Sequence, residues 1–253
     1  MSISVVINTY NAEKHLTEVL ESVKDFDEVL ICDMESTDRT LDIARQYGCR
    51  IVTFPKGDIT IVEPARNFAI QQAANEWVLL IDADELVTNG LKSFLYEQIS
   101  SKKNFSAIAI PRKNYFMNRF MHSAYPDYVV RFLKKDCTYW PPVIHASPKI
   151  NGPIQYLPSK QKELALVHLA NDSVSDIIRK SDNYSKYELP RRRNKNHGIF
   201  HLFMRPSFRF FKSYVLKKGF MDGIPGLIHA ILDSIYQFLI VAKLIEERTR
   251  HRD

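Results

Sequence analysis

Residues 77–85 read WVLLIDADE, a run of five apolar side chains followed at once by acidic residues. Such a continuous apolar run is typical of a strand that is buried on both faces of a parallel sheet. Asp82 and Asp84 cannot both lie in an apolar core, so we expect the strand to end at Ile81. Carboxylates on a loop bind Mg²⁺ or Mn²⁺ together with diphosphate oxygens. We therefore predict a metal and diphosphate site at Asp82-Ala83-Asp84, although a bare pair of this spacing is more often a solvated turn.

The chain around this segment alternates predicted strands and helices. We expect strands over 3–7, 28–32, 50–54, 77–81 and 107–111, and helices over 12–24, 41–47, 63–75 and 91–99. This order predicts an α/β fold with a mostly parallel, Rossmann-like sheet flanked by helices. Ligands of open α/β sheets bind at the carboxyl ends of the strands, which here carry polar residues.

Three of these polar residues are candidates for binding a nucleobase. Thr9 and Tyr10 follow the first strand and Asp33 follows the second. Asp33 either accepts a hydrogen bond from a base or caps the segment that starts near Ser36. Thr9 and Tyr10 are either ordinary loop residues or, in the case of Tyr10, a ring that packs along a base.

Four further residues carry two interpretations each. Arg66 either pairs with Glu63 or reaches a pyrophosphate, for which its planar donors are suited. Asp127 follows Pro126, and is either a turn residue or a general base toward an acceptor hydroxyl. His145 and His168 each end a short apolar stretch, and either is structural or completes the metal shell.

The charge of the chain is concentrated at its C-terminal end. Residues 186–253 carry 14 Lys and Arg against 6 Asp and Glu, whereas residues 1–185 carry 21 against 23. The three cysteines contain no CxxC pair, and the first residues lack the features of a signal peptide, so we expect a cytoplasmic protein. The tail is expected to meet anionic lipid, because no nucleic-acid recognition motif accompanies its charge and no nucleic-acid partner is predicted.

The sequence predicts two parts. Residues 1–173 form the catalytic domain, with a nucleotide half over 1–111 and an irregular acceptor half over 112–173. Residues 174–253 form a helical, basic extension, in which apolar residues recur at helical spacing over 224–245. His229, Asp233 and Gln237 interrupt that stretch, which favours a helix in the membrane interface over a spanning one; packing on the domain is the alternative.

The chain resembles family 2 glycosyltransferases, which have the GT-A fold. The resemblance lies in VVINTYNAEKHL (5–16), DMESTDRTLDIA (33–44) and ARNFAIQQAANEWVLLIDADE (65–85), in this order. The segments YPDYVVRFLKK (125–135), VIH (143–145) and LKKGFMDGIPGLIHAIL (216–232) are similar to a narrower group, the lipopolysaccharide core β-1,4-glucosyltransferases.

The resemblance implies a role for each candidate. Thr9, Tyr10 and Asp33 would hold the nucleobase and Arg66 the phosphates. The segment Asp82-Ala83-Asp84 would approach the ribose and bind the metal, joined there by His145 or His168. Asp127 would be the catalytic base.

The chain departs from the family pattern at two places. Met34-Glu35 and Arg39 stand in the second signature, and Ala146 follows His145 where relatives commonly carry Glu. The resemblance implies an inverting, metal-dependent hexosyltransferase that uses a UDP-sugar, with UDP-glucose first, and a glycolipid or oligosaccharide acceptor of the lipopolysaccharide core. It would act at the cytoplasmic face of the inner membrane.

Two other classes of function stay open. A non-catalytic scaffold for polysaccharide assembly is motivated by Ala146. A sugar nucleotidyltransferase also joins an α/β sheet to metal-binding carboxylates, but it usually carries a Gly-rich phosphate loop that residues 8–15 lack.

Overall fold

The computed structural model describes residues 1–57, 61–101, 104–142, 146–170, 173–193 and 198–250. Two compact units make up the chain. The first comprises Met1–Lys113 and Pro126–Leu169, and the second comprises Asn114–Tyr125 and Ala170–Asp253. Residues 114–125 belong to the second unit, whereas the sequence analysis placed them in the acceptor half; the predicted domain boundary at 173 stays a prediction.

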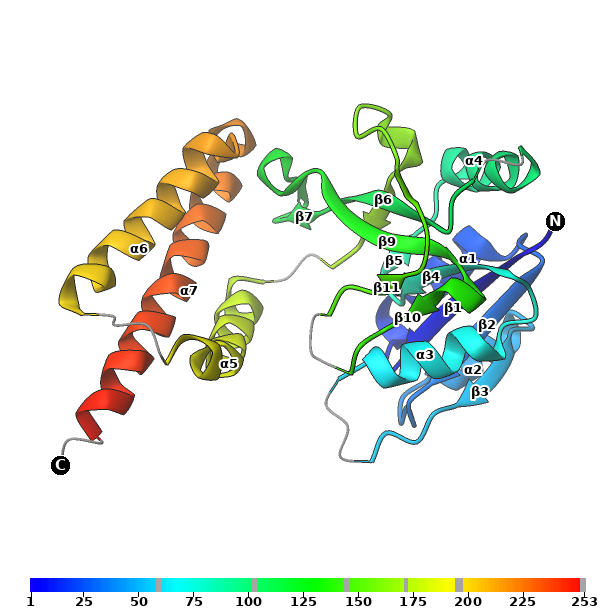
Figure 1. Cartoon of the computed structure of the whole chain (residues 1–253), viewed down its shortest axis with the longest axis horizontal. Helices are drawn as coiled ribbons and strands as arrows, with labels where there is room; N and C mark the ends of the chain where they lie inside the picture. The colour runs from blue at the N-terminus through cyan, green and yellow to red at the C-terminus, as the bar shows by residue number, and fades with distance from the viewer. Residues whose placement is uncertain (58–60, 102–103, 143–145, 171–172, 194–197, 251–253) are drawn as a thin grey trace. The chain divides into compact units, whose positions relative to one another are not determined.

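The first unit is built on one mixed, mostly parallel sheet in the order β3-β2-β1-β4-β9-β6-β13-β5, with β12 paired to β6 (Figure 1). Its strands are β1 (Ile3–Thr9), β2 (Glu28–Asp33), β3 (Arg50–Thr53), β4 (Trp77–Asp82), β5 (Glu85–Leu86), β6 (Ala107–Lys113), β9 (Asp127–Lys134), β12 (Ile154–Tyr156) and β13 (Leu166–His168). A short antiparallel pair, β10 (Thr138–Tyr139) and β11 (Lys149–Ile150), stands apart from the sheet.

Helices cover both faces of this sheet, as the alternating pattern predicts. They are α1 (Glu13–Val23), α2 (Thr40–Gln46), α3 (Glu63–Gln72) and α4 (Asn89–Ser100). Ile3, Val5 and Ile7 point to one side and pack in the core formed with α1, α2 and α4. Val6 points to the opposite side, into a second core with α3. The central strand β1 is therefore buried on both faces, which explains its unbroken apolar run.

Strand β9 enters the sheet between β4 and β6 and is antiparallel to both. Its partners place Asp127 opposite Arg112 at the end of β6. This insertion brings the later part of the unit to the carboxyl end of β4, beside the acidic segment.

The second unit is mainly helical. It contains the short strands β7 (Tyr115–Phe116) and β8 (Arg119–Phe120), and the helices α5 (Val174–Arg192), α6 (Ile199–Phe211) and α7 (Gly223–Arg250). Helix α5 starts with a capping box in which Ser173 and Asp176 satisfy each other's backbone N–H groups. Helices α5 and α6 both pack on α7. Among the described residues one segment, Gly219–Arg250, is long and apolar enough to cross a membrane, a property shared with core helices of soluble proteins.

Candidate active site

The registers of the parallel strands bring the candidate residues to one edge of the sheet. Thr9 on β1 lies opposite Asp33 on β2, and Asn8 on β1 lies opposite Asp82 on β4. The polar ends of three neighbouring strands therefore meet, as the sheet topology predicts.

Asp33 is a buried acceptor at this edge. Its Oδ1 accepts hydrogen bonds from Thr9 Oγ1 at 2.9 Å and Ser36 Oγ at 2.6 Å, and its Oδ2 accepts one from the Ser36 N–H at 2.8 Å. Helix α2 begins only at Thr40, so Asp33 orders the turn before the helix and is not its cap. Tyr10, in contrast, is exposed, and the Lys56 ammonium lies 4.5 Å from its ring centroid. The ring is accessible to a flat ligand.

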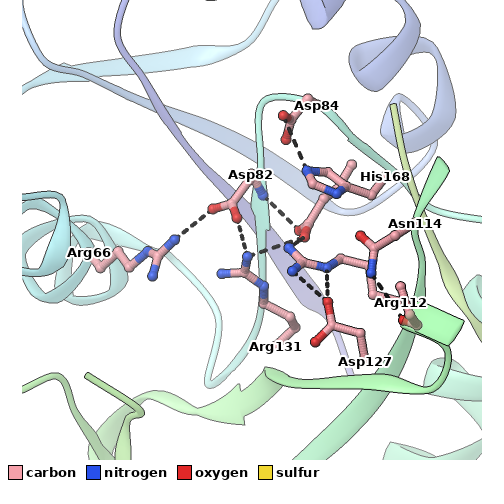
Figure 2. Close-up of polar contacts among 10 residues, drawn as sticks. Arg66, Asp82, Asp84, Arg112, Asn114, Asp127, Arg131 and His168 are labelled. Carbon is pink, nitrogen blue, oxygen red and sulfur yellow. Dashed lines mark hydrogen bonds and ion pairs between the residues drawn. The ribbon is translucent and has the colours of Figure 1, made fainter. Parts of the chain in front are cut away.

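Asp82 stands at the end of β4 between two arginines (Figure 2). Arg66 on α3 donates from Nη2 to Oδ1 at 2.7 Å, and Arg131 on β9 donates to Oδ2. Burial by itself would raise the pKa of Asp82, but the charges of Arg131 and Arg66 outweigh it and hold that pKa well below its usual range. Asp82 is therefore ionised, with both oxygens engaged.

The buried carboxylate of Glu85 extends these contacts into a network. Its Oε1 accepts from Arg112 Nη1 at 2.9 Å and from Arg131 Nη2 at 3.3 Å, and its Oε2 accepts from the Asp82 N–H at 3.0 Å. Glu85 is fully buried, and Arg131 is nearly so. Burial opposes the charge of Arg131, but Asp82 and Glu85 prevail and raise the pKa of its guanidinium. Glu85 ties the acidic segment to the two arginines.

Arg112 carries the network on to the predicted base. Its Nε and Nη2 both donate to Oδ2 of Asp127, at 2.9 and 2.6 Å. The Asp127 side chain remains 36% exposed, so a substrate can reach it. Asp127 is the first residue of β9, rather than a turn residue. The result is a continuous chain of contacts from Arg66 to Asp127.

The sequence analysis assigned no role to Glu85, Arg112 or Arg131. Their signal was weak but present. Arg131 interrupts the apolar β9 segment DYVVRFLK, and Arg112 ends the apolar run AIAIP. A charged side chain inside such a strand is rarely buried unless it is paired, so it indicates a partner on a neighbouring strand.

Asp84, the second carboxylate of the acidic segment, lies beside His168. His168 Nε2 lies 3.4 Å from Asp84 Oδ2, and the Leu169 N–H donates to the Asp84 carbonyl at 2.7 Å. His145, the other candidate ligand, lies outside the described residues. Within the part of the chain that the structure describes, no three His, Cys, Asp or Glu side chains are grouped as a metal site.

A cleft of about 760 Å³ opens beside the network. Arg66, Asp82, Arg112, Asp127 and Arg131 line its charged side. Its other walls are apolar and aromatic, and include Tyr128, Trp140, Ile154 and Tyr156. The rings of Tyr128 and Tyr156 meet edge to face with centroids 5.3 Å apart. A cleft with carboxylates on one side and rings on the other suits a sugar, which offers both hydroxyl groups and apolar faces.

Comparisons with known proteins identify relatives of the whole chain. The chain is 25% identical to an uncharacterized glycosyltransferase of Rickettsia typhi, over 99% of this chain and 89% of the relative. It is 21% identical to the lipopolysaccharide core biosynthesis glycosyltransferase LpsC of Rhizobium meliloti, over 97% of this chain and 93% of the relative. The crystal structure of Staphylococcus aureus TarS 1–349 in complex with UDP superposes with a TM-score of 0.51 at 18% identity, covering 98% of this chain and 92% of TarS 1–349.

The similarity to TarS shows the GT-A fold for this sheet. The family model described as glycosyl transferase family 2 matches residues 4–150, which hold Asp33, Arg66, Asp82 and Asp127. The chain belongs to glycosyltransferase family 2 and is a glycosyltransferase.

Proposed function

We propose that this glycosyltransferase transfers a hexose from a UDP-sugar, with UDP-glucose the first candidate, to a lipid-linked glycan of the lipopolysaccharide core, with inversion at the anomeric carbon. The observation that carries the proposal is the position of Asp127. Its exposed carboxylate lines the same cleft as Asp82 and Arg66 and is held from behind by Arg112. One cleft thus contains a candidate base and a candidate phosphate ligand.

The proposed reaction assigns one step to each of these residues. An acceptor hydroxyl beside Asp127 loses its proton to the carboxylate as its oxygen attacks the anomeric carbon from the face opposite the diphosphate. The bond from that carbon to the diphosphate oxygen breaks, and the nucleoside diphosphate leaves. We assign the Arg66 guanidinium, which lines the same cleft, to the departing phosphate oxygens. Because one displacement occurs, the anomeric configuration inverts.

The donor set is compatible with a divalent cation. Asp84 supplies a carboxylate and His168 an imidazole, and both types bind Mn²⁺, whereas Mg²⁺ favours oxygen ligands. Asp82 is less available, since Arg66 and Arg131 occupy its two oxygens. A bound cation would neutralise the charge that develops on the leaving diphosphate.

We assign the nucleoside of the donor to a separate set of residues. Thr9, Tyr10 and Asp33 lie at the ends of β1 and β2, next to Asp82 in the sheet. We assign the base and ribose to this edge, with the Tyr10 ring along the base. The UDP bound by TarS, a protein of the same fold, supports a uridine donor.

The acceptor part of the proposal places the protein at a membrane. We assign catalysis to residues 1–173, and peripheral contact with the anionic cytoplasmic face of the inner membrane to the basic residues 174–253. A lipid-linked acceptor agrees with the role of the relative LpsC in lipopolysaccharide core biosynthesis.

Nucleotide release across a panel of UDP- and GDP-sugars, with Mn²⁺, with Mg²⁺ and with EDTA, tests the proposal. We expect slow hydrolysis of one UDP-sugar that EDTA abolishes. Asp127→Asn should keep donor binding and lose transfer to an acceptor, whereas Asp84→Ala should abolish the metal-dependent activity and leave the fold intact. Normal transfer by Asp127→Asn would place the base elsewhere. Failure to bind any nucleotide sugar in the presence of metal would favour the scaffold alternative.

A further inference from the structure

Helix α6 presents its apolar side chains outward. Phe200, Phe203, Met204, Phe208 and Phe211 are between 49% and 69% exposed, and their spacing places them on one face of the helix. None of the 13 residues of α6 is buried. A helix at the surface of a water-soluble domain shows the opposite arrangement, with its apolar face toward the core.

Polar groups contribute to the contact between α6 and α7. Arg209 Nη2 lies 3.2 Å from Asp233 Oδ2, and Ser213 Oγ, in the turn that follows α6, donates to the same oxygen at 2.9 Å. Ser234 Oγ donates to the Pro206 carbonyl at 2.9 Å. The contact between the two helices is thus stabilised by polar groups.

Helix α7 carries a matching outward stripe. Ile224, Leu227, Ile231, Ile235 and Phe238 follow one another at steps of three or four residues, and each is at least 37% exposed. The turn between the helices adds exposed apolar residues, namely Val215, Leu216, Phe220 and Met221. The exposed large hydrophobic residues of the first unit are mostly tyrosines, two of which line the cleft already described.

The charge of residues 199–238 indicates what covers these faces. The segment contains five Lys and Arg and only two acidic residues. Asp233 is paired with Arg209, and Asp222 is 2% exposed and accepts hydrogen bonds from Ser123. A second copy of the same cationic face would meet like charges, whereas anionic phosphate headgroups above an acyl layer complement both the charge and the apolar side chains.

We propose that residues 199–238 form a docking hairpin that inserts its outward apolar faces into the interface of an anionic bilayer. Helix α6 has 13 residues, about 20 Å, which is too short for the hydrocarbon core of about 30 Å. The turn carries Lys212, Lys217 and Lys218, all exposed, which keep it at the level of the headgroups. Helix α7 is long enough to cross the bilayer, but His229, Asp233 and Gln237 interrupt its apolar stretch, so we assign the hairpin to the membrane surface. The inference rests on the proposed function only for the presence of a membrane.

Insertion of side chains differs from purely electrostatic contact in its response to salt. Vesicles of phosphatidylcholine with about one-third phosphatidylglycerol should carry the full chain upward in a flotation gradient. We expect flotation to persist in about 1 M NaCl, where the Debye length is about 3 Å. Vesicles of phosphatidylcholine alone should bind more weakly but measurably.

Substitutions on the outward face then test the assignment. Phe203→Ser with Phe208→Ser should lower the partition coefficient at least about thirtyfold. Tyr139→Ser, an exposed aromatic position in the first unit, should not change it. Because the two phenylalanines are exposed, the melting temperature should be kept; Phe200→Ser with Phe211→Ser provides an independent pair.

Three outcomes overturn the proposal. The first is no flotation of the wild-type chain, and the second is equal flotation of both paired variants and wild type. The third is a dimer in the absence of vesicles that dissociates in the paired variants, which would assign the face to a second copy. No part of this test depends on transferase activity, so its failure leaves the proposed reaction untouched.

Discussion

Replacing Glu85 by Gln removes one negative charge from the centre of the network and changes little else. Gln has the shape of Glu and can still accept a hydrogen bond from the Asp82 N–H. Arg112 and Arg131 lose their shared carboxylate, while Arg112 keeps Asp127 and Arg131 keeps Asp82. The variant therefore leaves a net positive charge in the network. The side chains of the two arginines that lose Glu85 are at most 19% exposed.

The size of the effect follows from this burial. Removing one partner of a buried ion pair costs about 3–5 kcal/mol. Since each arginine retains a second carboxylate, we expect the lower end, about 3 kcal/mol. For a chain of this size about 2–4 °C are lost per kcal/mol, so the melting temperature should fall by about 6–12 °C.

Tryptophan fluorescence isolates the relevant transition. The chain has two tryptophans, Trp77 and Trp140, and both lie in the unit that holds the network. Their emission therefore reports the unfolding of that unit alone.

Asp127→Asn is the matched control, because the two variants should separate stability from chemistry. Asp127 is 36% exposed, so its neutralisation should cost about 1 kcal/mol or less. Removing a general base should lower turnover by a factor of about 10² to 10⁴. A melting temperature of Glu85→Gln within about 2 °C of wild type would refute the structural role of Glu85. A large loss of stability in Asp127→Asn would show that Asp127 is structural.

Three further outcomes are expected. The pKa of Asp82 is lowered in the folded state from its ordinary value of 3.8, so the stability that Asp82 contributes is present above pH 3.8 and is lost as the pH falls through the folded pKa. The free energy of unfolding, measured with urea, should therefore differ between wild type and Asp82→Asn by about 1 kcal/mol less at about pH 3 than at about pH 5. Thr9→Val removes the hydroxyl that donates to Asp33 and should lower the free energy of unfolding by about 1–3 kcal/mol, read by tryptophan fluorescence; no change would mean that water replaces the hydroxyl. Gly226→Ala places a Cβ 2.0 Å from a backbone oxygen and should destabilise the hairpin by about 1–3 kcal/mol, measured in thermal melts followed by circular dichroism. Gly198→Ala, which has open space around its Cβ position, should destabilise it less, and equal effects of the two substitutions would contradict the close packing at Gly226.

Much of the fold could be predicted because burial on both faces leaves a clear pattern. The predicted strands 3–7, 28–32 and 77–81 agree with β1, β2 and β4 to within two residues. A parallel strand inside such a sheet must be apolar throughout, and its polar end marks the edge where ligands bind. This is why Asp33 and Asp82 could be placed at one edge from the sequence alone.

The network could not be predicted, because it depends on which strands are neighbours. Strand β9 lies antiparallel between β4 and β6, and nothing in the periodicity of its sequence indicates this insertion. Arg131 and Glu85 are 46 residues apart in the chain and meet only through this insertion. A charged residue in an apolar strand indicates that a partner exists, but it does not identify the strand that carries this partner.

The balance of charge in the network gives a final prediction about donor binding. Arg66, Arg112 and Arg131 face Asp82, Glu85 and Asp127, so these three guanidinium groups are already neutralised by three carboxylates. A diphosphate must therefore either displace Asp82 from its arginines or bring a cation with it, and the nearby Asp84 carboxylate favours the cation. Asp82→Asn removes the carboxylate partner of Arg66 and leaves Arg131 with Glu85 alone, so it should raise the affinity for UDP in EDTA about tenfold, by calorimetry. Asp84→Asn should remove the gain in affinity that Mn²⁺ gives to wild type. Unchanged affinity of Asp82→Asn in EDTA would mean that the diphosphate does not reach Arg66 or Arg131, and that the phosphate role of Arg66 is wrong.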